Sequence, residues 1–536
     1  MERERERKRE VAVFFVGRDR KGKERNGKKT RLNPRKNTHT HSVCARDSGK
    51  ARVDAAFGEV MTTCEKLWWL IDHGEAALRP EKRPSGRMMF YKSARVEFVP
   101  LGVVGAIVPW NYPYHNVLNP LSAALFAGNG LVLKVSEHAA WSGAGFVKRV
   151  VDAALAAVGA PAGLVAIVAG FGDAGAALVS GGVDHLIFVG STGVGRAVAA
   201  GAAPTLTPVT LELGGKDAFV VLEDADLDAA LAAGLRGAFQ SCGQNCAGAE
   251  RFIVHASVAD EFSRRAGAAA AAMRQGNPLG GGGGGGDEGG DGGGSAVVDS
   301  GSMCMPSAVA AVAALVDDAV AKGAKLLAGG SSKMIKTGQF YPPTVLYGVK
   351  RGMRLWEEEV FGPVFAIAVA KDDDDAVALA NDCSFGLGSA VFSRSQARAR
   401  SVGARLEAGM TSLNDFATTY MCQSLPFGGV KESGYGRFAG VEGLRALTTA
   451  KAVAEDACPL LIRTQIPPLL RYPIPDAGFG FVCGLIRMFY APEWTTAAAG
   501  LRDVIGAAVF GQVKKSEGSG ASGASAKKEP VAKKRK

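Results

Sequence analysis

The sequence predicts an α/β protein with two doubly wound domains, and three observations support this fold class. At 536 residues the chain is longer than one hydrophobic core usually supports, so two or more domains are expected. Hydrophobic residues make up 47% of the chain and charged residues 21%, a balance that permits a large buried core. From Leu101 onward, short β-branched runs alternate with Ala-rich helical stretches, which is the pattern of parallel βαβ units.

The two ends of the chain are basic and polar. Residues 1–50 hold 17 Lys/Arg against 7 Asp/Glu, and residues 514–536 hold 8 against 2, so the remainder is negative although the whole chain carries +11. A positively charged region between the two ends would favour nucleic-acid binding. Because this region carries a net negative charge, no nucleic-acid partner is expected. Both ends are predicted to be disordered arms. Their partner is left open between an anionic membrane surface, nucleic acid and none.

The first folded domain is predicted over residues 51–212. It opens with a helix over 53–78 whose apolar stripe holds Val60, Cys64, Leu67, Trp68 and Ile71. Residues 87–100 alternate like a strand. Buried parallel strands are then expected at the segments VVGAIV, LVLKV, LVAIVAG and HLIFVG.

A second domain is predicted over residues 213–430, with strands at FVVLE, FIVH, KLLAGG, FAIAVA and SAVFS. A glycine-rich surface insertion interrupts it at 280–294. Residues 431–456 are expected to return so that 446–453 pair with 87–100 in a small β element. Residues 457–513 form an extension whose apolar segments, 477–486 and 504–510, are too short to span a bilayer but suit a membrane surface or a partner.

Cysteine and histidine usage points to a reducing compartment and to no catalytic metal. Nine cysteines form no CxxC repeat, which argues against a disulfide scaffold. Seven histidines form no HExxH or Cys/His cluster. No signal peptide is recognised, because the first ten residues alternate Glu and Arg. An intracellular protein, cytoplasmic by default, is expected.

Two segments are candidates for binding a dinucleotide. Residues 187–196 read as a strand, a glycine turn and a helix start, where free N–H groups favour a pyrophosphate, although a structural turn is about equally compatible. Lys134 and Glu137 follow a strand at the sheet edge where cofactors bind. Glu137 can accept hydrogen bonds from ribose hydroxyls and would repel a 2′-phosphate, which favours NAD over NADP. In isolation, a solvated ion pair explains these two residues as well.

Three residues together indicate nucleophilic chemistry. Cys246 in a Gly-Gln-Asn-Cys loop is a candidate thiol nucleophile, Glu212 before a glycine turn a candidate base, and Asn111 a candidate oxyanion donor. Each has an ordinary alternative, namely a buried inert thiol, a surface carboxylate and a turn residue. Their joint occurrence is harder to explain by chance.

Seven motifs in order identify a resemblance: PWNYP, KVSE, FVGSTGVG, LELGGK, GQNC, EEEVFGPV and PFGGVKESGYGR. Over about residues 54–456 the chain resembles the aldehyde dehydrogenase superfamily, with two Rossmann-like domains and a small β oligomerisation element. GQNCAGAERF, MCQSLPFGGVKESGYGRFAG and the C-terminal segment resemble the plant and algal family 22 branch. Val135 departs from the family, which usually has proline between Lys134 and Ser136.

The resemblance implies specific roles. Cys246 would be the nucleophile, Glu212 the general base for thioester hydrolysis, and Asn111 the oxyanion donor. Members that transfer their product to coenzyme A lack a carboxylate at the position of Glu212, so hydrolysis is favoured. The residues expected to contact the cofactor are Trp110, Lys134, Glu137, Gly190, Ser191, Gly195, Leu213, Glu359 and Phe361.

The predicted function is NAD-dependent oxidation of an aldehyde to its carboxylic acid through a cysteine thiohemiacetal and thioester, in a homodimer or homotetramer. Tyr112, Phe416, Tyr420 and Phe427 are candidates to line an apolar aldehyde tunnel, although core packing explains each nearly as well. Two alternatives remain. One is a catalytically silent NAD-binding or structural protein of the same fold, and the other is a membrane-surface protein that acts through its basic ends.

Overall fold

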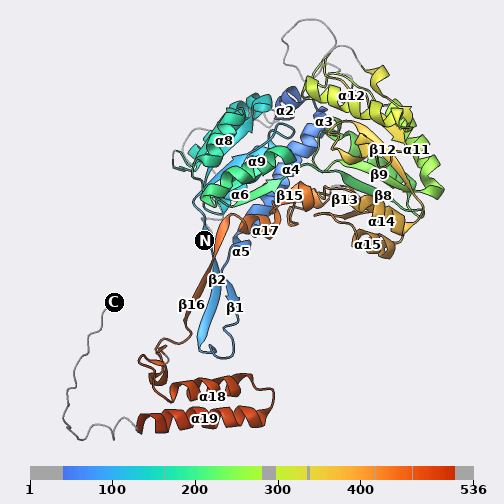
Figure 1. Ribbon diagram of the computed structural model, residues 1–536. Helices are drawn as coiled ribbons and strands as arrows, with labels where there is room; N and C mark the ends of the chain where they lie inside the picture. Colours follow the sequence, from blue (N-terminus) through green and yellow to red (C-terminus); the bar gives the residue numbers. More distant parts are fainter. Residues whose placement is uncertain are drawn as a thin grey trace, which may run out of the picture. The chain divides into compact units, whose positions relative to one another are not determined.

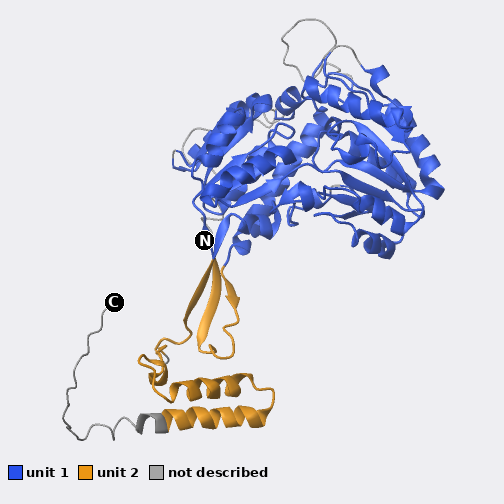
Figure 2. Ribbon diagram, in the orientation of Figure 1, with its two compact units in different colours: residues 1–79, 98–450 blue, residues 80–97, 451–536 orange. Residues whose placement is uncertain are grey.

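The computed structural model describes residues 40–161, 163–280, 297–334, 338–416, 418–460 and 463–513. The chain divides into two compact units, residues 1–79 with 98–450 (unit 1) and residues 80–97 with 451–536 (unit 2), as Figure 2 shows. The C-terminal arm, most of the N-terminal arm and nearly all of the predicted glycine insertion lie outside the described residues.

Unit 1 begins with helices that pack on its core. α2 (Thr40–Ser48) buries Cys44 and Ala45, so residues 40–50 of the predicted disordered arm are folded. A continuous helical run follows, made of α3 (Arg52–Ala55), the π-helical segment η2 (Ala56–Met61), α4 (Thr62–Trp69), the π-helical segment η3 (Leu70–Gly74) and α5 (Glu75–Ala77).

The predicted helix over 53–78 is therefore confirmed, but its predicted stripe is wrong at Trp68. That side chain is 41% exposed, whereas Trp69 and Leu70 are buried. The π-helical segments explain the difference, because each wider turn rotates the buried face away from a strict 3.6-residue period.

A six-stranded sheet forms one half of unit 1, in the order β15-β7-β6-β3-β4-β5. Figure 1 draws this half mostly in blue and green. Its central strands are parallel, and only the two-residue β15 pairs antiparallel, with β7. The strands are β3 (Val103–Ile107), β4 (Gly130–Ser136), β5 (Val165–Gly170), β6 (His185–Val189), β7 (Val209–Glu212) and β15 (Gly434–Tyr435), and the main helices are α6 (His115–Phe126), α7 (Lys148–Ala157), α8 (Gly172–Ser180) and α9 (Thr192–Ala202).

A seven-stranded sheet forms the other half, in the order β10-β11-β12-β9-β8-β13-β14, parallel except for β10 with β11. Stacked phenylalanines fill one side of its core, with the rings of Phe219 and Phe392 4.6 Å apart. The strands are β8 (Asp217–Val221), β9 (Ala249–His255), β10 (Lys325–Ala328), β11 (Thr344–Tyr347), β12 (Val364–Ala370), β13 (Ser389–Phe392) and β14 (Ser412–Leu413), and the main helices are α10 (Leu227–Phe239), α11 (Ala256–Ala271), α12 (Pro306–Ala321), α14 (Asp373–Asn381) and α15 (Gln396–Gly403).

Short helical segments complete unit 1. They are η4 (Glu137–Ala139), η5 (Trp141–Val147), η6 (Ala203–Thr205), η7 (Gln240–Gly243), η8 (Ser331–Lys333), α13 (Arg354–Glu357), α16 (Thr418–Met421), η9 (Lys431–Ser433) and α17 (Gly440–Arg445). With its two parallel sheets and their helices, the structure confirms the predicted α/β fold class.

A three-stranded sheet has the order β1-β2-β16, with β1 (Glu81–Arg83), β2 (Lys92–Pro100) and β16 (Thr448–Asp456). The strand over 87–100 and the strand over 446–453 are thus neighbours, as the sequence predicts. In unit 2, ion pairs cross this ladder between Lys92 and Asp456 at 2.7 Å and between Arg95 and Glu455 at 2.6 Å.

The rest of unit 2 consists of η10 (Pro468–Leu470) and a hairpin of α18 (Gly478–Tyr490) and α19 (Trp494–Val513). The two helices approach closely at Gly484, where an added Cβ would lie 2.9 Å from Val504 and 3.0 Å from the Gly500 carbonyl. Over the part of the chain that the structure describes, every helix is too short or too polar to cross a bilayer.

Candidate active site

Unit 1 contains a cavity of about 630 Å³ whose wall is built from both of its sheets. The wall uses loops that follow β3, β6 and β7 of the six-stranded sheet and the loop that precedes β9 of the seven-stranded sheet. Three of these loops follow the carboxyl ends of parallel strands, where α/β proteins usually bind ligands. Cys246, Glu212 and Asn111 all line this cavity.

Cys246 is held in a loop with an unusual backbone. Ser241 and Cys242 have left-handed φ angles of 54° and 59°, and Gly243 follows at 70°. Gly243 has to be glycine, because a Cβ there would lie 2.0 Å from the Gly362 carbonyl. The loop also passes close to the LELGGK turn, where a Cβ on Gly215 would lie 2.3 Å from the Cys246 carbonyl. Glycines in two sequence motifs thus allow the thiol loop and the Glu212 turn to meet.

Glu212 ends β7 and is only 3% exposed. Its Oε1 has no hydrogen-bond partner among the described residues. Burial raises the pKa of the carboxyl group from 4.5 to about 7, and the neighbouring Cys246 thiol opposes this rise. Burial, followed by the Glu212 charge, raises the pKa of the Cys246 thiol well above its ordinary value. Near neutral pH the Glu212 carboxyl group can therefore gain or lose its proton, whereas the Cys246 thiol keeps its own.

Asn111 follows β3 and is buried. Its Oδ1 accepts from Asn116 Nδ2 at 3.1 Å, and its Nδ2 donates to the Gln244 carbonyl at 3.2 Å. The Asn116 bond fixes which end of the amide carries the N–H groups. The donor end therefore points toward the loop that carries Cys246.

The glycine turn after β6 lies on the same cavity. Gly190 and Ser191 line it, and Ser191 is the residue that precedes the first turn of α9. Gly195 lies inside that helix, where an added Cβ would be 2.5 Å from Leu213 Cδ2, so this pair sets how closely α9 packs on the sheet.

Lys134 lies inside β4, two residues before its end, and Glu137 starts η4. Lys134 Nζ lies 3.4 Å from Glu137 Oε2. These two residues do not line the cavity. Their predicted contact with the cofactor stays a prediction.

Glu359, Phe361 and Trp110 meet at the cavity wall. The Trp110 and Phe361 rings pack edge to face with centroids 5.7 Å apart. Glu359 Oε1 accepts from the Gly215 N–H at 3.1 Å. Burial, followed by the Glu250 charge, raises the pKa of Glu359 to about 8.

Sequence reasoning missed a buried ion pair that supports this wall. Lys216 Nζ lies 2.8 Å from Glu250 Oε2, and both side chains are almost fully buried. Glu250 also accepts from the backbone N–H groups of Val360 at 2.9 Å and Phe361 at 3.0 Å. Phe361 has a left-handed φ of 48°, so these bonds hold a strained residue. Lys216 lies within LELGGK, but nothing in the sequence names its partner.

The second cysteine of the loop has a structural environment. Cys242 is 2% exposed, its Sγ lies 3.4 Å from the Ser302 carbonyl, and burial raises the pKa of its thiol to about 12. No group of three or more His, Cys, Asp or Glu side chains among the described residues is arranged to hold a metal ion.

The four aromatic residues singled out in the sequence, Tyr112, Phe416, Tyr420 and Phe427, all line the cavity. The Tyr420 and Phe427 rings contact edge to face at 4.6 Å. Most of the remaining wall is apolar and includes Phe57, Met421 and Phe438.

Comparisons with known proteins agree with this geometry. The aldehyde dehydrogenase family matches residues 30–453, and the match begins before the predicted start near residue 54. An aldehyde dehydrogenase-like protein of Schizosaccharomyces pombe is 40% identical over 84% of this chain and 84% of its own length. One from Saccharomyces cerevisiae is 42% identical over 81% of this chain and 67% of its own.

A solved structure shares the fold as well. PnpE of Pseudomonas sp. WBC-3, in complex with nicotinamide adenine dinucleotide, superposes with a TM-score of 0.74 and 29% identity over 87% of each chain. Two Rossmann-like halves around a cavity with a cysteine and a glutamate define an oxidoreductase that acts on aldehydes with a nicotinamide cofactor. The chain belongs to the aldehyde dehydrogenase family.

Proposed function

We propose that this protein oxidises apolar aldehydes to carboxylic acids with NAD, through a thioester on Cys246. The observation that carries the proposal is the convergence of Cys246, Glu212 and Asn111 on one cavity. Hydrolysis of the thioester requires a base near the acyl carbon, and Glu212 is a buried carboxyl whose pKa of about 7 suits that task.

The residues around the cavity suit a dinucleotide. The first turn of α9 offers N–H groups without helical partners to a pyrophosphate beside Gly190 and Ser191. Glu359 offers a carboxyl group to ribose hydroxyls, with Phe361 and Trp110 beside it. NAD held by these residues would supply the acceptor for the hydride of the carbonyl carbon.

In the first half of the reaction, Glu212 takes the proton of the Cys246 thiol and later passes it to solvent. The sulfur bonds to the carbonyl carbon, and the C=O π pair moves to oxygen. The Asn111 amide and the Cys246 backbone N–H donate to this oxyanion, as oxyanion-hole donors do. When the C=O bond re-forms and hydride departs, the acyl group remains on sulfur as a thioester.

In the second half, Glu212 removes a proton from water, and the hydroxide adds to the thioester carbon. The C–S bond then breaks, the sulfur leaves as a thiolate, and the carboxylic acid is released. The same carboxylate thus acts once on the thiol and once on water.

We propose NAD over NADP because of Glu137, whose charge beside Lys134 would repel a 2′-phosphate. Solved relatives include one bound to NAD and one from Streptococcus pyogenes bound to NADP+. Initial rates with NAD and NADP at equal concentration separate the two cofactors. A higher rate with NADP would reject the preference.

The proposed substrates are medium or long aliphatic and aromatic aldehydes, because aromatic and aliphatic side chains line most of the cavity. An aldehyde panel with NAD tests this class. Cys246→Ala should abolish NADH production, and Cys242→Ala, the matched control four residues away, should retain it. Turnover that survives in Cys246→Ala would end the mechanism. Absence of turnover with every aldehyde would favour a catalytically silent NAD-binding protein.

We further propose that the protein belongs to the plant and algal family 22 branch and that it is cytoplasmic. We also propose that it assembles as a homodimer or homotetramer through the three-stranded sheet. The nine cysteines of the sequence form no CxxC repeat, which suits a reducing compartment. β16 is an edge strand of its sheet and offers unpaired backbone groups to a second copy. Light scattering of wild type against a proline variant at Ala452 in β16 tests the assembly, and an unchanged mass would reject the interface.

A peripheral membrane contact is favoured by the helical hairpin of unit 2. Exposed apolar residues follow one stripe on α18, Phe479, Val482, Ile486 and Tyr490, and another on α19, Trp494, Leu501, Ile505 and Val509. The basic residues 514–536 follow directly in the sequence. Deleting 514–536 should weaken binding to anionic liposomes, and rising ionic strength should do the same. Binding without salt dependence would reject an electrostatic contact.

A further inference from the structure

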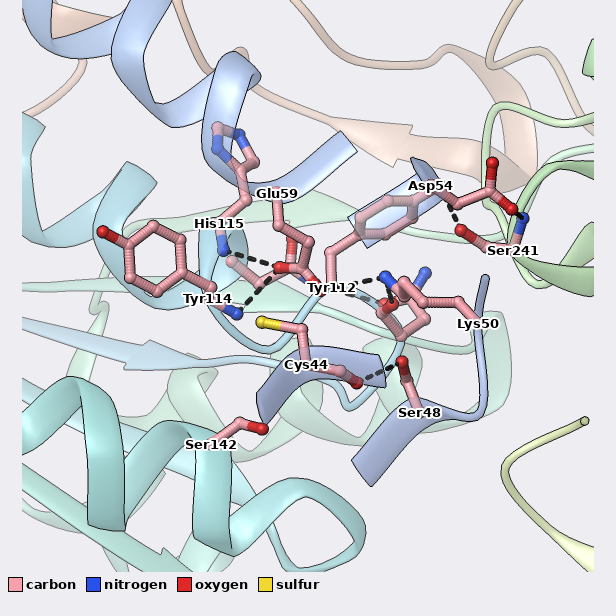
Figure 3. A network of polar contacts seen from close by, with 12 residues as sticks. Cys44, Ser48, Lys50, Asp54, Glu59, Tyr112, Tyr114, His115, Ser142 and Ser241 are labelled. Carbon is pink, nitrogen blue, oxygen red and sulfur yellow. Dashed lines mark hydrogen bonds and ion pairs between the residues drawn. The ribbon is translucent and has the colours of Figure 1, made fainter. Parts of the chain in front are cut away.

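A buried ion pair lies against the loop that carries Asn111. Lys50 and Glu59 are 1% and 0% exposed, and Lys50 Nζ lies 2.9 Å from Glu59 Oε1 (Figure 3). The same Nζ donates to the Asn111 carbonyl at 2.6 Å and lies 3.8 Å from the centre of the Tyr112 ring. The lysine therefore contacts two consecutive residues of the PWNYP motif.

Glu59 holds the other end of this loop. Its Oε2 accepts from the backbone N–H groups of Tyr114 at 2.9 Å and His115 at 3.0 Å. These donors lie at the start of α6, where helical N–H groups have no partner within the helix. One ion pair thus satisfies three buried backbone groups and fixes both ends of the segment 111–115.

The same stretch of chain also holds the loop of the nucleophile. Asp54, which lies between Lys50 and Glu59 in the sequence, accepts from the Ser241 N–H at 2.9 Å (Figure 3). It also pairs with Arg236 at 3.0 Å. Ser241 is the first of the left-handed residues in the Cys246 loop. Residues 50–59 therefore contact both the Asn111 loop and the Cys246 loop, which are joined to each other by the Asn111 bond to Gln244.

We propose that Lys50 and Glu59 are positioning residues that place the Asn111 amide at the carbonyl oxygen of the substrate. The inference rests on the proposed function, in which Asn111 is the oxyanion donor. Stability alone is a weak reason for this pair, because apolar residues of similar volume often replace a buried ion pair without loss. An apolar pair would leave the Asn111 carbonyl and the N–H groups of Tyr114 and His115 without these partners.

The expected effect on the reaction is large. A displacement of about 1 Å in a reacting group costs up to about a hundredfold in rate, and the loss of an oxyanion donor costs about a hundredfold or more. Lys50→Met should therefore lower kcat about ten- to a hundredfold, while the KM for NAD stays near its wild-type value. Lys50→Met also leaves Glu59 unpaired, whereas Lys50→Met with Glu59→Gln leaves no unpaired charge. The double variant should recover thermal stability but not kcat.

The experiment is a double-mutant cycle with Asn111→Ala on the full-length enzyme. If Lys50 acts through Asn111, the charge-neutral double variant should lower kcat strongly in the wild-type background and hardly at all in the Asn111→Ala background. Lys66→Met is the matched control, because Lys66 is as buried as Lys50 and lies on the helical run that carries Glu59. Its ammonium lies over the Trp69 ring at 5.8 Å. Its effect on kcat should be the same in both backgrounds.

Two failures can be told apart. If Asn111→Ala itself leaves kcat unchanged, the proposed oxyanion role is wrong, whatever Lys50 does. If Asn111→Ala lowers kcat but the losses multiply independently in the combined variant, the oxyanion role stands and the positioning role of Lys50 and Glu59 is wrong. A wild-type kcat in the charge-neutral double variant would also overturn the inference.

Discussion

Replacing Glu212 by glutamine removes the base that the proposed reaction uses first on the thiol and then on water. The change keeps the shape of the side chain and removes its ability to take a proton. Because general-base catalysis contributes about 10²- to 10⁴-fold, steady-state NADH production should fall by about a hundredfold or more. If the remaining thiolate still attacks the aldehyde, each active site should release about one NADH in a first burst and then stall as the thioester.

The same substitution should change how stability depends on pH. The pKa of Glu212 is raised from 4.5 to about 7, so the folded state holds a proton that the unfolded state has already lost within this window. Wild-type stability should therefore fall between pH 4.5 and 7, by about 3 kcal/mol in total, because one pKa unit corresponds to about 1.4 kcal/mol. Glu212→Gln lacks this loss, so it should be more stable than wild type at pH 8 and similar at pH 4.5.

Stopped-flow NADH absorbance, mass spectrometry of the acyl-enzyme and thermal unfolding at pH 4.5 and 8 measure these effects. The wild-type rate of thioester hydrolysis should rise with pH through about pH 7 as Glu212 loses its proton. A variant that keeps the wild-type steady-state rate, or a wild-type hydrolysis rate that is flat across pH 6 to 8, would refute the role of Glu212. A variant less stable than wild type at pH 8 would refute the account of its burial.

Three further predictions follow from the supporting residues. Lys216→Met should destabilise the enzyme by about 3 to 5 kcal/mol in unfolding measurements, because it leaves Glu250 buried without its cation. Gly195→Ala should cost about 1 to 3 kcal/mol and raise the KM for NAD, since its Cβ would lie 2.5 Å from Leu213; an unchanged KM would contradict this. Glu137→Gln should raise the NADP to NAD ratio of kcat/KM, and a constant ratio would remove Glu137 from cofactor selection.

Contiguous motifs explain why so much of the site was accessible from the sequence. A strand followed by glycine indicates the turn at Gly190 and Ser191 that starts α9. Gly243, three residues before Cys246, indicates a loop with left-handed φ angles. Such requirements act over a few residues, so they appear as readable patterns. The order of the motifs then predicted the fold, the family and several of the residues that line the cavity.

The buried ion pairs that support the site show no comparable pattern in the sequence. Glu59 meets the N–H groups of Tyr114 and His115 across more than fifty residues of chain, and Glu250 meets that of Phe361 across more than a hundred. Lys50 belongs to a stretch whose composition predicts disorder, yet its ammonium is fully buried. Side-chain partners of this kind depend on how distant segments pack, which periodicity and composition do not encode.

Sequence by itself determined the groups available to this protein: an amide, a glycine turn that starts a helix, a carboxyl group and a thiol, in that order along the chain. Tertiary structure decided how these groups behave. The pKa of Glu212 depends on the water that packing excludes from it, and the direction of the Asn111 amide depends on Asn116 and Gln244. Desolvation and hydrogen-bond geometry are properties of the folded surroundings, so they exist only once the two halves of unit 1 have closed around the cavity.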